Sequence, residues 1–285
     1  VSSKGNRKIL KLGFCSLVAL IMLSIFFKWF EHSQVFQPSD HPAKPLPADA
    51  PSYREIILTT EDKLNLKAWH FVNPSISKDN RRVVLHAHGN AGDRGSRLGF
   101  YQVFDQVGLD CLAFDYRGYG GNPGRPSEEG LYRDMDAAYL WLVAQGYRPE
   151  NILSFGESLG GGVASDLASR RKVGALILHS TYASIPKLAK ELFPFLPVRL
   201  FGTIAFDTEN KLPRIQCPVL ILHSASDTLI KRSHADTNLA AANEPKVLEI
   251  IAGDHNEQPY ARMDHYTAVL KDFVESLKET ASSDL

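Results

Sequence analysis

A serine set between glycines is the feature of this sequence that points most directly to chemistry. The stretch GESLG, residues 156–160, follows the apolar run 151–156 and precedes a helix-like stretch, 159–170. This G-x-S-x-G pattern between a strand and a helix is typical of a sharp turn that exposes a serine hydroxyl. We therefore expect Ser158 to be a nucleophile, with the N–H of Leu159 as an oxyanion donor. A glycine-rich packing turn is the alternative interpretation.

A serine hydroxyl is a poor nucleophile at neutral pH unless a base takes its proton and an acid orients that base. In this kind of sheet the order along the chain is Ser, then Asp or Glu, then His, each after the end of a strand. Asp227 follows the apolar run 218–223, and His255 follows the run 246–251. The order and positions predict Ser158, Asp227 and His255 as a catalytic triad.

Neighbouring polar residues leave other interpretations open. Asp227 also fits a turn, Asp207 fits a helix cap, and Asp254 fits a hydrogen-bond network in the loop of His255. Two further histidines fall in helical patterns and are expected to be surface residues: His234 and His265.

The second oxyanion donor is expected in the loop HAHGNAG, residues 86–92, which follows a strand-like run. Asn90 holds the expected donor position, with Ala91 as the near alternative. His86 and His88 alternate along the strand and would share one face, as two metal ligands would. No acid or cysteine cluster nearby completes a metal site, so packed or hydrogen-bonded histidines are expected.

The stretch 115–130, DYRGYGGNPGRPSEEG, is dense in glycine and proline and follows the next strand-like run. Such a composition favours a structural turn near the site, held by Asp115 and Arg117. Contact of these two residues with the substrate is the alternative.

Strand-like and helix-like stretches alternate along the chain, which predicts a doubly wound α/β sheet. The later strands are continuous apolar runs, typical of strands buried on both faces. The strand-like runs are 54–60, 64–72, 82–88, 110–116, 151–156, 174–179, 218–223 and 246–251. The helix-like stretches are about 96–107, 128–145 (with Ser127 as N-cap), 159–170, 232–243 and 260–279.

The connection between the runs 174–179 and 218–223 is longer than the others. It contains LFPFLPVRLF, residues 192–201, which is apolar but broken by two prolines. A small lid over the site and an ordinary helix packed on the sheet are both compatible with this pattern.

The N-terminal region predicts a membrane anchor. Residues 12–27 carry no charge and would cover about 24 Å as a helix, and 9–30, with lysines near the ends, about 33 Å. Basic residues precede the run, which predicts a cytoplasmic N-terminus and a catalytic domain on the non-cytoplasmic side. A cleaved signal peptide is the rival interpretation, although no small-x-small site follows the run closely.

The chain therefore divides into three parts: a basic tip and transmembrane anchor (1–30), a Pro-rich linker or extended strap (31–52) and a catalytic domain (53–280). The 285 residues, 44% of them hydrophobic, suffice for one large α/β domain. A formal net charge of +0, with no basic stripe beyond the N-terminus, argues against nucleic acid as a partner. The three cysteines form no CxxC pair that would indicate a disulfide framework or zinc site.

The motifs together resemble the α/β-hydrolase superfamily. The residues that carry the likeness are HGNAG, DYRGYG with GRPSEEGLYRD, GESLGG, the Asp227 loop and GDHN, and it covers about 53–277. Within the superfamily they are similar to small-lid, membrane-anchored hydrolase-domain proteins related to serine aminopeptidase-like hydrolases. Two departures are Glu157, where relatives often have Arg or Gln, and the absence of a glycine before Asp227.

The resemblance implies an α/β-hydrolase fold with a mostly parallel eight-stranded sheet, helices on both faces and a small lid. It implies a serine hydrolase without a cofactor or metal, with Ser158, Asp227 and His255 as its triad. Relatives include thioesterases that act on lipid-modified proteins and esterases of unknown substrate. We therefore expect hydrolysis of acyl esters or thioesters of lipid origin or on lipid-modified proteins. The alternatives are an aminopeptidase-like hydrolase, whose substrate ammonium would pair with Glu157, and a non-catalytic membrane-tethered binding module.

Overall fold

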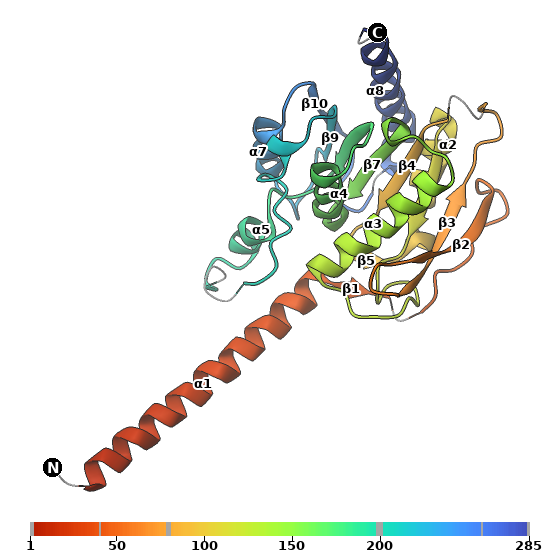
Figure 1. Cartoon of the computed structure of the whole chain (residues 1–285). Coiled ribbons are helices and arrows are strands. Elements are labelled where there is room, and N and C mark those ends of the chain that lie inside the picture. The colour runs from red at the N-terminus through yellow and green to blue at the C-terminus, as the bar shows by residue number, and fades with distance from the viewer. Residues whose placement is uncertain (1–2, 40, 78–80, 198–201, 258, 284–285) are drawn as a thin grey trace.

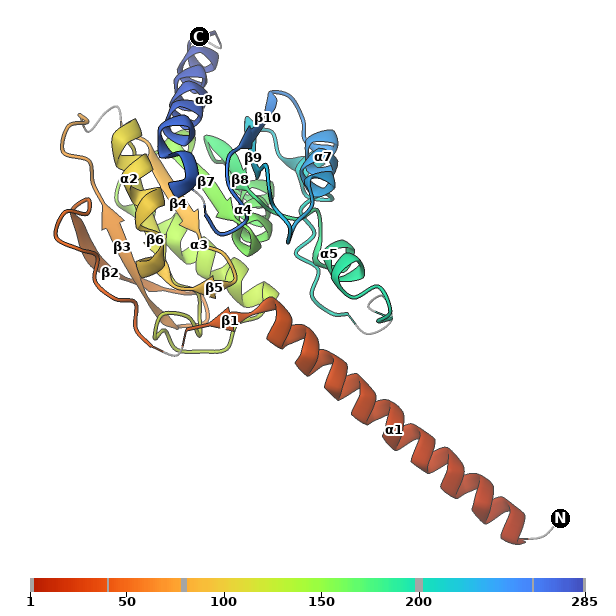
Figure 2. The same cartoon turned by 180° about the vertical axis from the view of Figure 1, so that it is seen from behind.

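The computed structural model describes residues 3–39, 41–77, 81–197, 202–257 and 259–283. A twisted sheet covered by helices forms the body of the molecule, and one long helix projects from it (Figure 1). The view from behind shows that the other face of the sheet is covered as well (Figure 2).

The sheet has eight strands, as the sequence predicts. Strands β2–β3 and β3–β6 pair antiparallel, and the remaining neighbours pair parallel. In spatial order the strands are β10 (Lys246–Ile251), β9 (Val219–Ser224), β8 (Ala175–His179), β7 (Ile152–Glu157), β4 (Val83–Ala87), β6 (Asp110–Phe114), β3 (Asn65–Phe71) and β2 (Tyr53–Thr59).

Two apolar cores lie on opposite faces of this sheet, because its central strands bury side chains on both sides. One core packs α3 (Glu128–Ala144), α4 (Leu159–Arg170) and α7 (Arg232–Ala241) against the sheet. The other packs α2 (Leu98–Val107) and α8 (Met263–Ser283). Helix α3 begins where predicted, since the Ser127 hydroxyl accepts a hydrogen bond from the N–H of Gly130.

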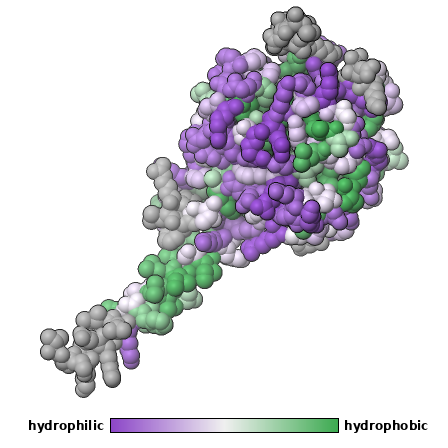
Figure 3. Space-filling model, in the orientation of Figure 1, coloured by the Kyte–Doolittle hydropathy of each residue, from purple (hydrophilic) through white to green (hydrophobic). Residues whose placement is uncertain are grey.

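The projecting helix is α1 (Ser3–Val35), whose 33 residues correspond to about 50 Å. Its stretch Lys11–Val35 is long and apolar enough to cross a membrane, and none of its most apolar window is buried. Apolar side chains form a continuous band on the projecting part of α1, whereas the visible face of the domain is mostly hydrophilic (Figure 3).

The segment after residue 30 lies against the domain. The sequence alone is compatible with either a linker or an extended strap in this segment. Helix α1 continues to Val35, and the side chains of Val35 and Phe36 are buried in the core beside α3. Strand β1 (Gln37–Pro38) then pairs parallel with β5 (Ala91–Gly92). Helix α1 therefore enters the domain directly, because burial of two apolar side chains and a short β-ribbon hold the segment that follows it in place.

The long connection after β8 carries α5 (Ile185–Leu192); residues 198–201 of its apolar stretch lie outside the described residues. Two glutamates hold the chain that follows. The Glu31 carboxylate accepts hydrogen bonds from the N–H groups of Thr203 and Ile204, and the Glu128 carboxylate accepts those of Ala205 and Phe206. In both views α5 lies on the side of the domain from which α1 projects (Figures 1 and 2).

Buried histidines make the stability of this fold depend on pH. Burial lowers the pKa of His86 to about 3 and that of His179 to about 4, from an ordinary value of 6.5. Below pH 6.5 the unfolded chain therefore binds protons that the folded chain does not, so stability falls as pH falls. The loss at pH 5 is about 2 kcal/mol for each such histidine.

We expect His86→Phe to reduce this dependence, because the ring of His86 lies among aromatic neighbours that include Phe100 and Phe155. Urea unfolding at pH 7 and pH 5 measures it: the difference in unfolding free energy should shrink by about 2 kcal/mol. His265→Gln is the control, since His265 is exposed. An unchanged difference in His86→Phe would show that His86 does not titrate as inferred.

Candidate active site

Ser158 occupies a strained turn between β7 and α4. Its backbone has φ 50° and ψ −111°, a conformation that residues with a Cβ rarely adopt. Two hydrogen bonds with the end of β8 and the chain after it hold this turn: the Ser158 N–H donates to the carbonyl of His179, and the Thr181 hydroxyl donates to the carbonyl of Ser158. The surrounding structure thus fixes the serine of the predicted turn, which is buried apart from the cavities it lines.

The glycines around Ser158 are required by close backbone approach, as the sequence analysis expects. A Cβ on Gly156 would lie 2.3 Å from the carbonyl oxygen of Gly160. A Cβ on Gly160 would lie 2.0 Å from the carbonyl oxygen of Ala87. Strand β7, helix α4 and the end of β4 therefore pack so closely that only glycine fits between them.

The three residues proposed for the triad come together above the carboxyl ends of their strands. His255, after β10, places its Nε2 3.1 Å from the Oγ of Ser158. Its Nδ1 lies 2.7 Å from the Oδ2 of Asp227, which follows β9. Because the carboxylate accepts at Nδ1, that nitrogen carries a proton, and Nε2 is left to accept the hydrogen of the serine hydroxyl.

Asp227 is held in one orientation by its own loop. Its Oδ1 accepts hydrogen bonds from the N–H groups of Leu229, at 3.0 Å, and Ile230, at 2.8 Å. Burial raises the pKa of Asp227, but the hydrogen bond and charge of His255, together with the N–H of Ile230, outweigh it, and the pKa lies below the ordinary value. Asp227 therefore stays ionised at neutral pH.

The competing acids have structural contacts of their own. The Asp254 carboxylate accepts hydrogen bonds from the backbone of Asn256 and Glu257, and Asp207 bonds to Asn210. The two other histidines differ: His265 is exposed as expected, whereas His234 is buried and accepts at Nδ1 from a backbone N–H. The helical pattern around His234 did not reveal that its face packs inward.

Hydrogen bonds on both sides of Asn90 hold the loop after β4. The Nδ1 of His88 lies 2.7 Å from the carbonyl oxygen of Gly89 and donates to it. In a trans peptide the N–H points opposite to the carbonyl, so this bond sets the direction of the Asn90 N–H. The carbonyl of Asn90 accepts from the N–H of Gln37 and the hydroxyl of Tyr119. Asn90 and Leu159 line one cavity together with Ser158.

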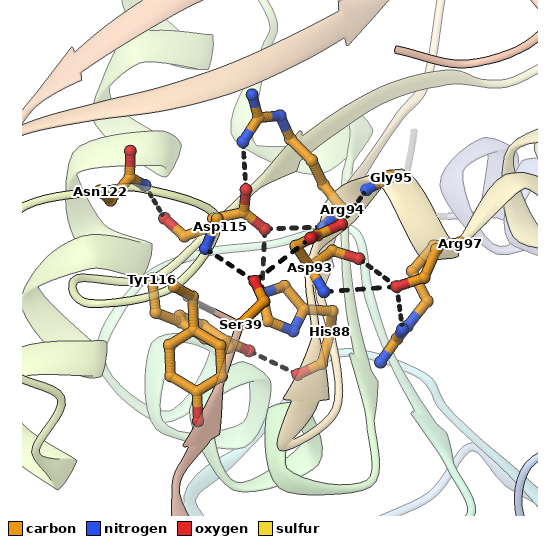
Figure 4. A network of polar contacts seen from close by, with 12 residues as sticks. Ser39, His88, Asp93, Arg94, Gly95, Arg97, Asp115, Tyr116 and Asn122 are labelled. Carbon is orange, nitrogen blue, oxygen red and sulfur yellow. Dashed lines mark hydrogen bonds and ion pairs between the residues drawn. The ribbon is translucent and has the colours of Figure 1, made fainter. Parts of the chain in front are cut away.

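A buried polar network supports this loop from behind (Figure 4). The Asp115 carboxylate pairs with the Arg94 guanidinium, and its Oδ1 lies 3.4 Å from the Nε2 of His88. The Tyr116 hydroxyl donates to the carbonyl of His88. His88 thus occupies a hydrogen-bonded role, and no group of three possible metal-ligating side chains occurs among the described residues.

Asp115 and Arg117 stabilise their loop through different partners. Arg117 donates to the carboxylates of Asp134 and Asp62, whereas Asp115 pairs with Arg94. The expectation of one charged pair is therefore corrected to two separate ion-pair clusters. Neither residue lines the cavities beside Ser158.

An ion pair that the sequence did not reveal joins the two sides of the site. The Nε of Arg97 lies 2.6 Å from the Oε2 of Glu157, and its Nη2 donates to the carbonyl of Ala91. Burial raises the pKa of Glu157, but the charge and hydrogen bond of Arg97, together with the nearby His86 and His179, outweigh it and lower the pKa to about 2. Arg97 therefore connects the turn of Ser158 to the loop of Asn90.

Ser158 stands between two cavities of different character. One, of about 290 Å³, is lined mostly by polar groups, including Arg97, Glu157, His179 and Tyr260. The other, of about 370 Å³, is mostly apolar and is formed by α4, α5 and the end of α1. A substrate whose carbonyl carbon lies over Ser158 would place one of the carbonyl's substituents in the polar cavity and the other in the apolar cavity.

Comparison with known proteins identifies the family. Residues 82–212 match the family described as alpha/beta hydrolase fold. Over 234 residues the chain is 32% identical to human alpha/beta hydrolase domain-containing protein 17B, covering 81% of this chain and 76% of that protein. The chain belongs to the α/β-hydrolase family. This α/β-hydrolase is also 36% identical over 246 residues to an uncharacterised protein of Mycobacterium tuberculosis, covering 85% of this chain and 87% of that protein.

Solved structures share the fold of this α/β-hydrolase. An esterase of Pyrococcus furiosus is similar with a TM-score of 0.64 and 20% identity, covering 84% of this chain and 98% of that one. Est1E of Butyrivibrio proteoclasticus, solved with bound ferulic acid, has a TM-score of 0.63 and 19% identity, covering 79% and 99%. At these identities the likeness shows the fold.

Proposed function

We propose that this α/β-hydrolase is a membrane-anchored serine hydrolase that cleaves acyl esters or thioesters through an acyl-enzyme. The hydrogen-bonded chain Ser158–His255–Asp227 carries the proposal, because it places a nucleophile, a base and an orienting acid in sequence. The structural likeness to esterases supports carboxyl-ester chemistry.

In acylation, the Ser158 Oγ attacks the substrate carbonyl carbon while the Nε2 of His255 takes the hydroxyl proton. Asp227 stabilises the resulting imidazolium through Nδ1. The N–H groups of Leu159 and Asn90 stabilise the oxyanion, each worth about 3 kcal/mol in the transition state. When the intermediate collapses, the alcohol or thiol leaves with the proton from His255.

In deacylation, water takes the place of the leaving group and gives its proton to the Nε2 of His255. The hydroxide attacks the acyl carbonyl, and the acid leaves as the serine recovers its proton. Every proton passes through His255, and the chemistry needs no cofactor.

The aminopeptidase-like alternative needs a free carboxylate for the substrate ammonium. Glu157 is already paired with Arg97 at 2.6 Å, so its charge is compensated within the protein. An amide is also the harder bond, because its leaving amine must be protonated. These two points favour esters and thioesters over peptides.

The test of this proposal is a substrate panel on the full chain. We expect hydrolysis of nitrophenyl acyl esters and acyl thioesters, with kcat/KM rising from acetyl to longer acyl chains, because an apolar cavity adjoins Ser158. Aminoacyl amides should react slowly. Falling efficiency from acetyl upward with rapid amide cleavage would favour the aminopeptidase alternative, and no labelling by a fluorophosphonate would favour the non-catalytic module.

The membrane topology is a separate part of the proposal. We propose that α1 remains uncleaved and spans the membrane, with the catalytic domain on the non-cytoplasmic face, because basic residues precede its apolar run. Protease added to the outside of spheroplasts should digest the domain, and alkaline carbonate should not extract it. A domain that is protected there, or recovered as a trimmed soluble protein, would contradict this topology.

A further inference from the structure

The apolar cavity beside Ser158 continues toward the anchor helix. A second cavity, of about 420 Å³, lies between α1 and α5. The two cavities share five lining residues: Gln34, Val35, Ile185, Ala189 and Phe193. The two spaces are therefore adjacent, and together they lead from Ser158 to the side of α1.

Helix α1 forms one wall of this path. Phe27, Phe30 and Gln34 line the outer cavity, and Gln34 also lines the inner one. At 1.5 Å per residue, Phe27 and Gln34 lie about 10 Å apart along the helix. The helix that anchors the protein is thus also part of the surface that leads to Ser158.

This wall is attached firmly to the domain. The Glu31 carboxylate accepts hydrogen bonds from the N–H groups of Thr203 and Ile204 and from the Thr203 hydroxyl. The rings of Phe30 and Phe193 meet edge to face, with centroids 5.4 Å apart. These neutral donors satisfy the carboxylate oxygens, so Glu31 lines the outer cavity as a hydrogen-bonded charge.

With α1 spanning a bilayer as proposed, the outer end of the path lies at the depth of the membrane surface. The uncharged run of α1 ends at Phe27, and Lys28 follows it. Trp29 is 61% exposed, and Phe195, after α5, is 97% exposed. Exposed aromatic side chains are favoured at membrane–water interfaces, so this end of the domain fits the boundary between headgroups and hydrocarbon.

From these observations we infer that α1 and α5 form a binding site for the acyl chain, which enters from the bilayer between them and reaches Ser158 without crossing water. The inference rests on the proposed function and adds to it the position of the acyl chain. The occupant is a fatty acyl chain, because the path is lined mainly by apolar side chains and begins at hydrocarbon depth. The leaving group then occupies the polar cavity beside Arg97.

A photoreactive probe tests this route in the full chain reconstituted in phospholipid nanodiscs. The probe is a long alkyl fluorophosphonate with a diazirine near the far end of its chain. The Ser158 Oγ forms a bond to phosphorus as fluoride leaves, and His255 takes the serine proton. Light then expels dinitrogen from the diazirine, and the carbene inserts into a neighbouring bond, which mass spectrometry locates.

We expect the cross-links within residues 27–35 of α1 and within residues 185–193, which are α5 and its C-cap. Cross-links confined to the polar cavity, at Arg97 or Tyr260, would overturn this inference. Labelling of Ser158 in that experiment would still support the proposed function. Failure to label Ser158 at all would remove the proposed function and this inference with it.

A substitution gives a second, independent readout. Ala189→Trp fills the junction between the two cavities, so the ratio of kcat/KM for hexadecanoyl over acetyl esters should fall at least about 10-fold, the effect of a lost apolar subsite. Leu140→Trp, on an exposed position of α3, is the matched control and should leave the ratio unchanged. An unchanged ratio in Ala189→Trp would overturn the proposed path.

Discussion

Replacing Ser158 with alanine is expected to lower kcat for a nitrophenyl ester by about 10⁴- to 10⁶-fold. The Oγ of Ser158 lies 3.1 Å from the Nε2 of His255. In the alanine variant no other group can attack the substrate carbonyl from that position. Steady-state hydrolysis and fluorophosphonate labelling measure the loss. Ser165→Ala is the matched control, because Ser165 is buried on the same helix and donates to the carbonyl of Gly162.

The backbone of Ser158 provides a second variant that separates chemistry from folding. Its φ of 50° is strained for serine, whereas glycine adopts such conformations without a Cβ clash. Ser158→Gly should therefore raise the unfolding free energy by about 1 kcal/mol while activity is still lost. Retained activity in either variant would show that Ser158 is not the nucleophile.

Asp227→Asn is expected to lower kcat by about 10⁴-fold with little effect on folding. The Oδ1 of Asp227 accepts two backbone N–H groups, so the amide oxygen of asparagine would take that place. The amide NH₂ would then face His255 and donate to its Nδ1. This leaves the proton on Nε2, where it prevents His255 from accepting the proton of Ser158.

Asp254→Asn is the matched control, since Asp254 lies next to His255 in the chain. Its carboxylate accepts hydrogen bonds from two backbone N–H groups, and the amide oxygen of asparagine can accept the same bonds. Its kcat should stay within about 3-fold of the wild type, a difference of under 1 kcal/mol. Thermal melts verify that both variants are folded. Near-normal activity of Asp227→Asn would assign the orienting role to another acid.

Much of this fold follows from local patterns in the chain. Continuous apolar runs such as 151–156 and 218–223 predict buried parallel strands, because such strands carry side chains into two cores. The glycines around Ser158 identify the turn, since they mark where backbone must pass closely. The order of Ser158, Asp227 and His255 along the chain suggested that three loops would meet.

Other features depend on contacts between distant segments, and no local pattern encodes them. Arg97 and Glu157 are 60 residues apart, and neither neighbourhood indicates their ion pair. The burial of His234 depends on which face of its helix meets the domain, and the two-residue strands β1 and β5 exist only because they pair with each other.

The clearest example is helix α1. By itself the sequence determined an apolar helix of membrane-spanning length, because that property depends only on length and composition. That the last turns of α1 join α5 beside Ser158 was decided only by the tertiary structure. There, Glu31 binds the backbone of Thr203 and Phe30 packs on Phe193, contacts that span more than half of the chain.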